Sequence, residues 1–332
     1  MKRLAIFAGY DKDNIIDDYV LFYLKELSKL SDIIYVADCE MPESELNKVK
    51  DYTIKAISER HREYDFGSYK RGYIYAKENN ILENYDYLIL CNDSVYGPFF
   101  NFKEIVKNME SKNTDVWGIF RYLEDKDFEE HFQSYFISMR KKIFISEWYK
   151  NFILNIKKEE NKNNIIKKYE IGMSVLFTKN NCSFSSFMDS SFIESPINNS
   201  VPSVYSLEAI SNKFPFFKIS IFSEPTFFFM DIEKLNKIFN IIKENYPIEI
   251  IIKHLNRVIE KDKIKYLFPR FKKFNINIVN KKFINILSKY SVSGKYQIVL
   301  NCLNKLSLTI DFPKGISYID YGYKNFDFLI DL

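Results

Sequence analysis

The stretch Tyr-Asp-Tyr-Leu-Ile-Leu-Cys-Asn-Asp-Ser-Val-Tyr-Gly-Pro-Phe-Phe, residues 85–100, is the part of the chain from which the fold is best worked out. Its apolar run Tyr87–Cys91 is short and bounded by polar residues, which is typical of a strand buried on both faces of an α/β sheet. Asn92 and Asp93 follow at once, and Gly97-Pro98 predicts a turn. Because open α/β sheets bind ligands at the carboxyl ends of their strands, Asp93 is a candidate binding residue. A plain turn cap fits Asp93 equally well at this point.

Strands and helices are predicted to alternate upstream of this stretch. Strands are expected at Leu4–Ala8, Ile33–Ala37 and Ile54–Ser58, with helices from Asp13 or Asn14 to about Leu30 and over Glu43–Asp51. This alternation favours a parallel sheet, so the predicted fold class is α/β, with helices flanking the sheet. The second strand also ends in an acid, Asp38, which should lie at the same sheet edge as Asp93.

The polar, glycine-containing segment 61–72 leads into a helix expected to end near Asn79. Its start carries Arg62, Lys70 and Arg71, and the N-terminus of a helix attracts anions through its free amides and its dipole. Solvated surface charge is the alternative interpretation, and these residues alone do not decide between the two.

A second candidate acid lies in the helix predicted over residues 163–179. Ile166, Glu170, Met173 and Phe177 follow one another at helical spacing, which places Glu170 in an apolar stripe where a carboxylate is costly unless it is paired or used. Burial would raise its pKa, a useful property in a general base. The structural alternative is a salt bridge, for example to Arg140 or Lys141.

Composition narrows the class of protein. The chain has 332 residues, of which 46% are hydrophobic and 28% charged, and such a chain is globular, with a core sufficient for one large domain or two. A net charge of +4 is too small to argue for a nucleic-acid partner. The four cysteines are far apart in sequence and form no metal-binding or redox pair, which predicts a reduced, cytoplasmic protein. No run is long enough to span a membrane, and no secretory signal is expected at the start.

The character of the sequence changes near its C-terminal end. Basic, Asn-rich residues are followed by strand-like, aromatic segments, so we predict a main domain over 1–264 and an extension over 265–332 that contacts the acceptor or a membrane. Lys261–Lys273 combines basic residues with interleaved aromatics, a composition that suits an anionic membrane surface. A solvated helix end packed against the tail is the alternative.

Several motifs in order resemble the rhamnan synthesis protein F glycosyltransferases over about residues 3–260. They are Phe7–Asp11 with Asp17–Val20, Tyr64–Ser68 with Gly72, Leu90–Pro98, Trp117-Gly118, His131–Phe136, Tyr169–Ser174 and Pro215–Lys218. The resemblance implies a GT-A-like nucleotide-sugar fold. It also implies growth of a cell-surface polysaccharide from a nucleotide-sugar donor, with dTDP-L-rhamnose as the first donor to try, on an oligosaccharide or lipid-linked acceptor.

The metal motif of such enzymes is usually Asp-x-Asp, and here Cys91-Asn92-Asp93 keeps only the second acid. The resemblance therefore implies a divalent cation, Mg²⁺ or Mn²⁺, on Asp93. The departure from the motif leaves neutral oxygens of Asn92 and Ser94 as further ligands, or cationic side chains as a partial replacement.

Roles for the other site residues follow from the resemblance together with the positions above. Glu170 is assigned as the base of an inverting displacement, and His131 is placed near the sugar and acceptor, with a plain surface position as its alternative. The predicted donor-binding residues are Tyr10, Asp11, Asp38, Arg62, Asp65, Gly67, Asn92 and Gln133.

Two other functions compete with this hypothesis. A sugar-1-phosphate nucleotidyltransferase also uses a metal-bound Asp, but it would need a Gly-rich basic loop after the first strand, and Gly9–Asp13 is a poor version of one. A non-catalytic glycan-binding protein would explain the many aromatics but not a carboxylate on an apolar helix face. If the chain is a transferase with a lipid-linked acceptor, we expect it in the cytoplasm, peripherally at the inner face of the cytoplasmic membrane.

Overall fold

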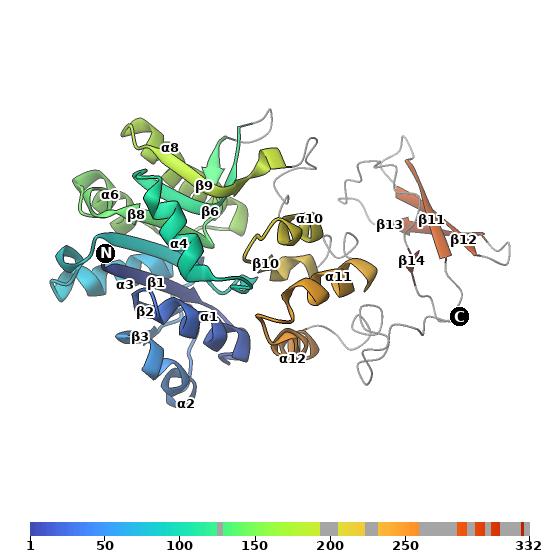
Figure 1. Cartoon of the computed structure of the whole chain (residues 1–332), viewed down its shortest axis with the longest axis horizontal. Coiled ribbons are helices and arrows are strands. Elements are labelled where there is room, and N and C mark those ends of the chain that lie inside the picture. The colour runs from blue at the N-terminus through green and yellow to red at the C-terminus, as the bar shows by residue number, and fades with distance from the viewer. Residues whose placement is uncertain are drawn as a thin grey trace. The chain divides into compact units, whose positions relative to one another are not determined.

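The computed structural model describes residues 1–124, 129–192, 205–222 and 232–258, and the backbone of four strands at 284–290, 296–302, 307–312 and 327–328 (Figure 1). The chain divides into two compact units. The first comprises residues 1–219 and 241–251, and the second comprises residues 220–240 and 252–332. The boundary predicted at 264/265 and the basic segment Lys261–Lys273 lie outside the described residues.

The first unit is built on a mixed sheet whose strands are ordered β3-β2-β1-β4-β8-β6, with β7 and β9 both paired to β6. Their bounds are β1 (Arg3–Gly9), β2 (Asp32–Ala37), β3 (Lys55–Ser58), β4 (Tyr87–Asn92), β6 (Val116–Tyr122), β7 (His131–Phe132), β8 (Phe136–Arg140) and β9 (Phe184–Asp189). Strands β1 to β4 are parallel, β9 is parallel to β6, and β8 is antiparallel to both of its neighbours. The predicted α/β class, a mostly parallel sheet flanked by helices, is confirmed.

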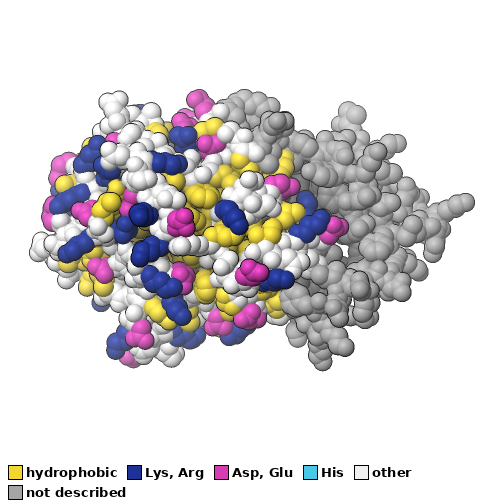
Figure 2. All heavy atoms as spheres, in the orientation of Figure 1, with side chains coloured by type: hydrophobic (Ala, Val, Ile, Leu, Met, Phe, Trp, Pro, Cys, Tyr) yellow, Lys and Arg dark blue, Asp and Glu magenta, His cyan; other side chains and the backbone are white. Residues whose placement is uncertain are grey.

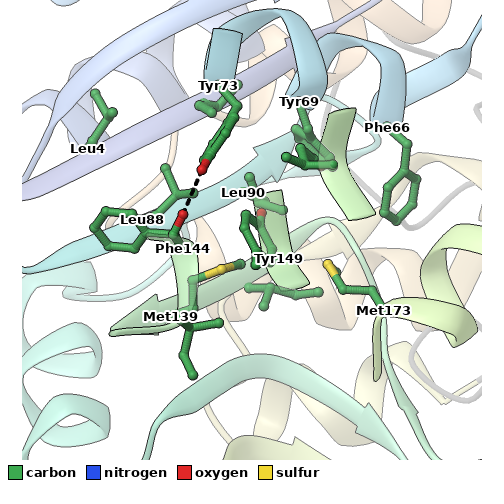
Figure 3. Close-up of a cluster of buried hydrophobic side chains, with 14 of the residues drawn as sticks. Leu4, Phe66, Tyr69, Tyr73, Leu88, Leu90, Met139, Phe144, Tyr149 and Met173 are labelled. Carbon is green, nitrogen blue, oxygen red and sulfur yellow. Dashed lines mark hydrogen bonds between the residues drawn. The ribbon is translucent and has the colours of Figure 1, made fainter. Parts of the chain in front are cut away.

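Strand β4 is buried along its whole length, as its apolar sequence predicted. Leu88 and Leu90 point into the cluster drawn in Figure 3, which also contains Leu4, Ile6 and Ala8 of β1. Many of the covering side chains come from α3 (Tyr64–Glu78), α6 (Glu147–Leu154) and α8 (Gly172–Lys179).

The opposite face of the sheet is covered by α1 (Asp18–Ser28) and α4 (Phe102–Ser111). There Phe7 of β1 packs edge-on against Tyr23 of α1, with ring centroids 5.2 Å apart, and Phe102 of α4 packs against Phe136 of β8 at 5.3 Å. Because both faces are covered, the carboxyl-end edge of the parallel strands is where their polar side chains gather.

The remaining elements are short. In the first unit the short α-helices are α2 (Glu43–Leu46), α5 (Lys141–Phe144), α7 (Lys162–Ile165) and α10 (Ser206–Ser211), and the short strands are β5 (Val95–Tyr96) and β10 (Phe217–Lys218). The 3₁₀ segments are Asn47–Tyr52, Leu82–Asn84, Ser190–Phe192 and Ile219–Phe222, the last of which runs into the second unit. A π-helical segment covers Ile166–Ile171. Helices α11 (Ile232–Ile242) and α12 (Ile248–Val258) follow. The C-terminal strands β11 (Ile284–Tyr290), β12 (Tyr296–Cys302), β13 (Ser307–Phe312) and β14 (Asp327–Phe328) form an antiparallel sheet in the order β13-β12-β11-β14.

Two predicted helices were wrong in extent. The first begins at Asp18 rather than near Asp13, because the Asp11 carboxylate accepts the backbone N–H groups of Asp13 and Ile15 and holds them in a loop. The helix expected over Glu43–Asp51 is a single α turn followed by a 3₁₀ segment. The long helix near the acid Glu170 is present but passes through a π-helical turn, a distortion common at functional sites.

Gly97, just after β5, lies against the backbone of Pro215, which is far away in the sequence. Its φ is +133°, and a Cβ there would lie 2.4 Å from the backbone oxygen of Pro215, just before β10. Strand β10 pairs with β5, so the two segments leave no room for a side chain.

We expect Gly97→Ala to lower the free energy of unfolding by about 2–5 kcal/mol, because it adds a disfavoured φ to a backbone clash. Urea unfolding measures the loss. Gly172→Ala is the control, since its Cβ would meet its nearest atom at 3.6 Å. Equal stabilities of the two variants would contradict this account of Gly97.

Acidic and basic side chains are interspersed over the face shown in Figure 2. Within the described residues, no helix is long and apolar enough to cross a membrane.

Candidate active site

Asp93 lies directly beyond the carboxyl end of β4 and is fastened to the end of β1. Its Oδ2 accepts the Tyr10 N–H at 2.7 Å, and its own N–H donates to the Ala8 carbonyl at 3.2 Å. The Tyr19 hydroxyl donates to its carbonyl oxygen at 3.1 Å. The turn that follows is capped instead by Asn92, whose Oδ1 accepts the N–H and the hydroxyl of Ser94 at 3.1 and 2.7 Å. The side-chain cap at Ser94 is thus Asn92, while the Asp93 carboxylate bonds to Tyr10.

A second carboxylate comes from the first turn of α3. The Asn92 side chain, buried at the end of β4, donates to Asp65 Oδ2 at 2.8 Å. Burial raises the pKa of Asp65 to about 6; the positive charges of Lys162 and Lys218 oppose this rise, and the negative charge of Glu170 adds to it. Burial also raises the pKa of Asp93 well above its usual value, and the charges of Asp65 and Asp11 add to the effect. The sheet edge therefore holds several acids in a partly desolvated space.

Asp65 gives a stability test. Its folded pKa of about 6 lies above its usual value of 3.8, so the folded state holds the proton more tightly between these values. Its ionised form therefore destabilises the protein above pH 6, and this cost disappears as the pH falls towards 4.

Asp65→Asn should accordingly raise the free energy of unfolding by about 2 kcal/mol at pH 7, with the gain shrinking towards pH 4. Urea unfolding at a series of pH values measures it. Asp86→Asn, at the exposed opposite end of β4, is the control for the same change of carboxylate to amide outside the site. A gain that grew as the pH fell would contradict the assignment.

Glu170 lies in the π-helical segment and is held by the loop before β8. Its Oε2 accepts the Ser134 N–H at 2.9 Å and the Ser134 hydroxyl at 2.5 Å. Within the described residues, its Oε1 accepts no hydrogen bond. The salt bridge to Arg140 or Lys141, considered as the structural alternative, is not formed: Arg140 bonds to Asn113 and Lys141 pairs with Glu83. Glu170 thus has one fixed oxygen and one open oxygen.

Asp38, at the end of β2, organises a separate group of side chains. Its Oδ1 accepts the Arg62 N–H at 2.8 Å and pairs with Arg60 at 3.0 Å. The Arg60 guanidinium lies 5.2 Å from the centre of the Tyr10 ring, and Tyr10 is 48% exposed. Two side chains therefore lie near Asp38: that of Arg60, which the sequence pattern did not single out, and that of His61, whose Nδ1 is 3.6 Å from Oδ1. Arg62 is exposed and reaches Asp38 through its backbone.

Two residues of the following turn have structural roles. The His61 side chain is fully buried, accepts the Glu63 N–H on Nδ1 at 3.1 Å and lies 3.0 Å from Ser68 Oγ through Nε2. Burial lowers the pKa of His61 to about 4. A Cβ on Gly67 would lie 2.6 Å from His61 Nδ1 and 2.3 Å from Glu63 Cβ. Gly67 thus allows the turn to pack onto α3, which by itself accounts for a glycine there.

His131 and Gln133 lie on the segment that leads to Ser134. His131 is 1% exposed, so the surface position considered for it is wrong. Its Nδ1 lies 2.7 Å from the Glu129 carbonyl, and its Nε2 is buried without a partner among the described residues. The Gln133 N–H donates to Phe120 at 3.1 Å. The roles predicted for both near the sugar stay predictions.

Cations approach the acids from two further elements. Lys162 begins α7, and Lys218 ends β10 with its Nζ 5.2 Å from the centre of the Tyr135 ring. Burial lowers the pKa of Lys218, while the charges of Glu170 and Asp65 raise it. The sequence motif Pro215–Lys218 includes this lysine, but the position of Lys218 follows from the pairing of β10 with β5.

The fit of a divalent cation depends on Asp93. Across residues 1–124, 129–192, 205–222 and 232–258, no three His, Cys, Asp or Glu side chains are grouped to hold a metal ion. Asp11 has one oxygen committed to two backbone amides, and Asp93 has one committed to Tyr10. Mg²⁺ is often held by one or two carboxylates together with substrate phosphates. The residues present fit a cation that is shared with a bound diphosphate.

The family is established by comparison. A family model described as rhamnan synthesis protein F matches residues 33–312, and the chain belongs to that family. The match extends past residue 265, into a region whose motifs had pointed to no family. Membership supports a glycosyltransferase in general terms.

Individual relatives are more distant. The uncharacterized protein y4gN of Sinorhizobium fredii (strain NBRC 101917 / NGR234) is 24% identical over 176 residues, 52% of this chain and 45% of that protein, so the chain spans under half of its length. Core-mannan synthase A (CmsA/Ktr4) of Aspergillus fumigatus, in its Mn/GDP form, is 11% identical with a TM-score of 0.30, over 52% of this chain and 69% of that one.

A glycosyltransferase involved in the glycosylation of the major capsid of PBCV-1 is 9% identical with a TM-score of 0.33, over 72% of this chain and 98% of that one. At these TM-scores the structural likenesses carry no argument about the reaction of this chain.

Proposed function

We propose that this chain transfers a sugar from a nucleotide-sugar donor to a hydroxyl group of a growing cell-surface polysaccharide, with inversion at the anomeric carbon. The observation that carries the proposal is Glu170, a carboxylate with one oxygen fixed by Ser134 and the other open, whose charge acts on Asp65 at the sheet edge beside Asp93. Membership in the rhamnan synthesis protein F family supports it.

The reaction exchanges one bond for another at the anomeric carbon. The acceptor oxygen forms a bond to this carbon as the bond to the diphosphate oxygen breaks, and the bonding electron pair leaves with the diphosphate. The acceptor proton passes to Glu170 Oε1, which is the base. The two hydrogen bonds from Ser134 fix the orientation of the carboxylate, and such positioning of reacting groups contributes several kcal/mol to catalysis.

The nucleoside end of the donor belongs with Tyr10, Arg60 and Asp38. The exposed Tyr10 ring offers a flat face on which a nucleobase can stack. Arg60 makes a cation–π contact with this ring while it is paired with Asp38. Asp11, Arg62, Asp65, Gly67, Asn92 and Gln133 complete the proposed donor site. dTDP-L-rhamnose is the first donor to test, on the strength of the family.

Asp93 would hold a divalent cation, Mg²⁺ or Mn²⁺, through its free carboxylate oxygen. Bound there, the cation would supply positive charge to the departing diphosphate. The carboxylates around Asp93 make some source of positive charge necessary, because alone they would repel a diphosphate.

The location is proposed to be the cytoplasm, at the inner face of the membrane that carries a lipid-linked acceptor. The support is the basic and aromatic composition of Lys261–Lys273. Flotation with anionic vesicles at low and high salt tests this part. Binding at low salt that is lost at high salt is expected, and no binding at either would contradict it while leaving the transferase proposal intact.

Incubation with a panel of nucleotide sugars separates this function from its rivals. A transferase slowly hydrolyses its own donor to sugar and nucleoside diphosphate when no acceptor is present. A nucleotidyltransferase would instead form nucleoside triphosphate and sugar phosphate from a nucleotide sugar and pyrophosphate, and a binding protein would convert none of them. Either of these two outcomes would overturn the proposal.

A further inference from the structure

The segment that carries Lys218 is tied to the loop after Asp93 by backbone contacts. Strand β10 pairs antiparallel with β5, which sets Phe217 opposite Tyr96 and Lys218 opposite Val95. The Ile219 N–H donates to the Ser94 carbonyl at 3.0 Å, and the Phe99 N–H donates to the Pro215 carbonyl at 2.9 Å. Lys218 is therefore held across a strand ladder from a residue two positions beyond Asp93, although it is far away in the sequence.

The aromatic rings of Tyr135 and Phe216 set the position of the Lys218 side chain. Its Nζ lies 5.2 Å from the centre of the Tyr135 ring, close enough for a cation–π contact. Tyr135 is buried, and Phe216 packs against it with ring centroids 6.1 Å apart. Phe216 also stacks on Phe136 of β8. The ammonium group thus lies over the ring of Tyr135, in the turn before β8, and Phe216 supports that ring.

Lys218 has no ion-pair partner among the described residues, unlike three other partly buried cations, Arg3, Lys70 and Arg71. Arg3 makes a two-point pair with Glu110, and both Lys70 and Arg71 pair with Glu63. Among the described residues, Lys218 makes neither a salt bridge nor a hydrogen bond, and it interacts with Glu170 and Asp65 only through their longer-range charges. A desolvated cation without a direct partner is costly for a fold to keep, and a bound anion would remove that cost.

We propose that Lys218 binds the diphosphate of the nucleotide-sugar donor and neutralises the charge that gathers on it as the bond to the sugar breaks. The inference rests on the proposed function and adds a protein cation on which the charges of Glu170 and Asp65 act. The electron pair of the breaking bond moves to the diphosphate oxygen, and the ammonium group stabilises that oxygen without taking part in bond exchange. The single carboxylate that the Cys91-Asn92-Asp93 motif retains fits a site where a lysine shares this task.

Lys213 provides a matched control. It comes from the same stretch of chain and lies over an aromatic ring, with its Nζ 5.0 Å from the centre of Phe100, but it is exposed and pairs with no element of the site. If Lys218 served only to cover an aromatic ring, the two lysines would behave alike.

The test is calorimetric titration of GDP, UDP and dTDP, and of the corresponding nucleosides, into the full chain and its variants. A charge-assisted contact contributes about 1.5–3 kcal/mol, which corresponds to a fall of about 10-fold to 150-fold in diphosphate affinity for Lys218→Met. Nucleoside affinity should change less than about twofold, because the nucleoside carries no phosphate. Lys218→Arg should keep most of the diphosphate affinity, and Lys213→Met should match the wild type.

Thermal unfolding of each variant accompanies the titrations. Lys218→Met should be as stable as the wild type or more so, since it removes an unpaired desolvated charge; Lys218→Gln replaces it should it fail to fold. A wild-type protein that binds a nucleoside diphosphate, together with a Lys218→Met variant that binds it equally well, would overturn the inference and leave the proposed function standing. A wild type that binds no nucleoside diphosphate would overturn both.

Discussion

Glu170→Gln is expected to lower turnover by about two to four decades while donor affinity stays nearly unchanged. Glutamine keeps an oxygen that can accept the two hydrogen bonds from Ser134, so the geometry of the π-helical segment should survive. What it loses is the ability to take the acceptor proton. Turnover is measured with saturating donor and acceptor, and donor affinity by calorimetry.

Glu110→Gln is the control that separates a loss of catalysis from a loss of stability. Glu110 is buried and makes a two-point ion pair with Arg3 in another part of the sheet. Its replacement should lower the melting temperature, because it weakens a buried pair, while turnover stays within about twofold. If Glu170→Gln instead lowered the melting temperature and left turnover intact, Glu170 would be a structural residue and the proposed base would be wrong.

Asp93→Asn should reduce the affinity for the donor in the presence of Mn²⁺ by about tenfold or more, because a neutral amide binds a hard cation more weakly than a carboxylate does. The fold should be kept, since asparagine can still accept the Tyr10 N–H. Donor titrations with and without Mn²⁺ measure the effect. Asp86→Asn is the control, because Asp86 lies at the other end of β4 and bonds to the Lys2 N–H. Donor affinity unchanged in Asp93→Asn would remove the metal from this position.

Local pattern was enough to predict the centre of the fold. Tyr87–Cys91 is apolar between polar ends, and it forms a strand buried on both faces. The spacing around Glu170 predicted a carboxylate facing inwards, and Ser134 supplies the partner that such a position requires. In both cases the physical cause acts over a few residues, so the sequence contains it.

Other features depend on contacts that a local pattern does not contain. Helix α1 starts later than predicted because the Asp11 side chain accepts hydrogen bonds from two backbone amides. The position of Lys218 opposite Val95, two residues beyond Asp93, depends on the pairing of β10 with β5, between segments that are far apart in sequence. Arg60 rather than Arg62 reaches Asp38 with its side chain, because Arg62 adopts a positive φ of 62° and turns outwards.

One experiment tests directly whether this chain moves a sugar from a nucleotide sugar to an acceptor, as we propose. The most direct measurement follows both products together, using the donor that the wild type hydrolyses, an oligosaccharide or lipid-linked acceptor, and mass spectrometry. We expect an acceptor heavier by one sugar residue, released nucleoside diphosphate in equal amount, and the loss of both in Glu170→Gln. Release of nucleoside diphosphate with no gain in acceptor mass across the acceptors tried, or no release from any donor, would contradict it.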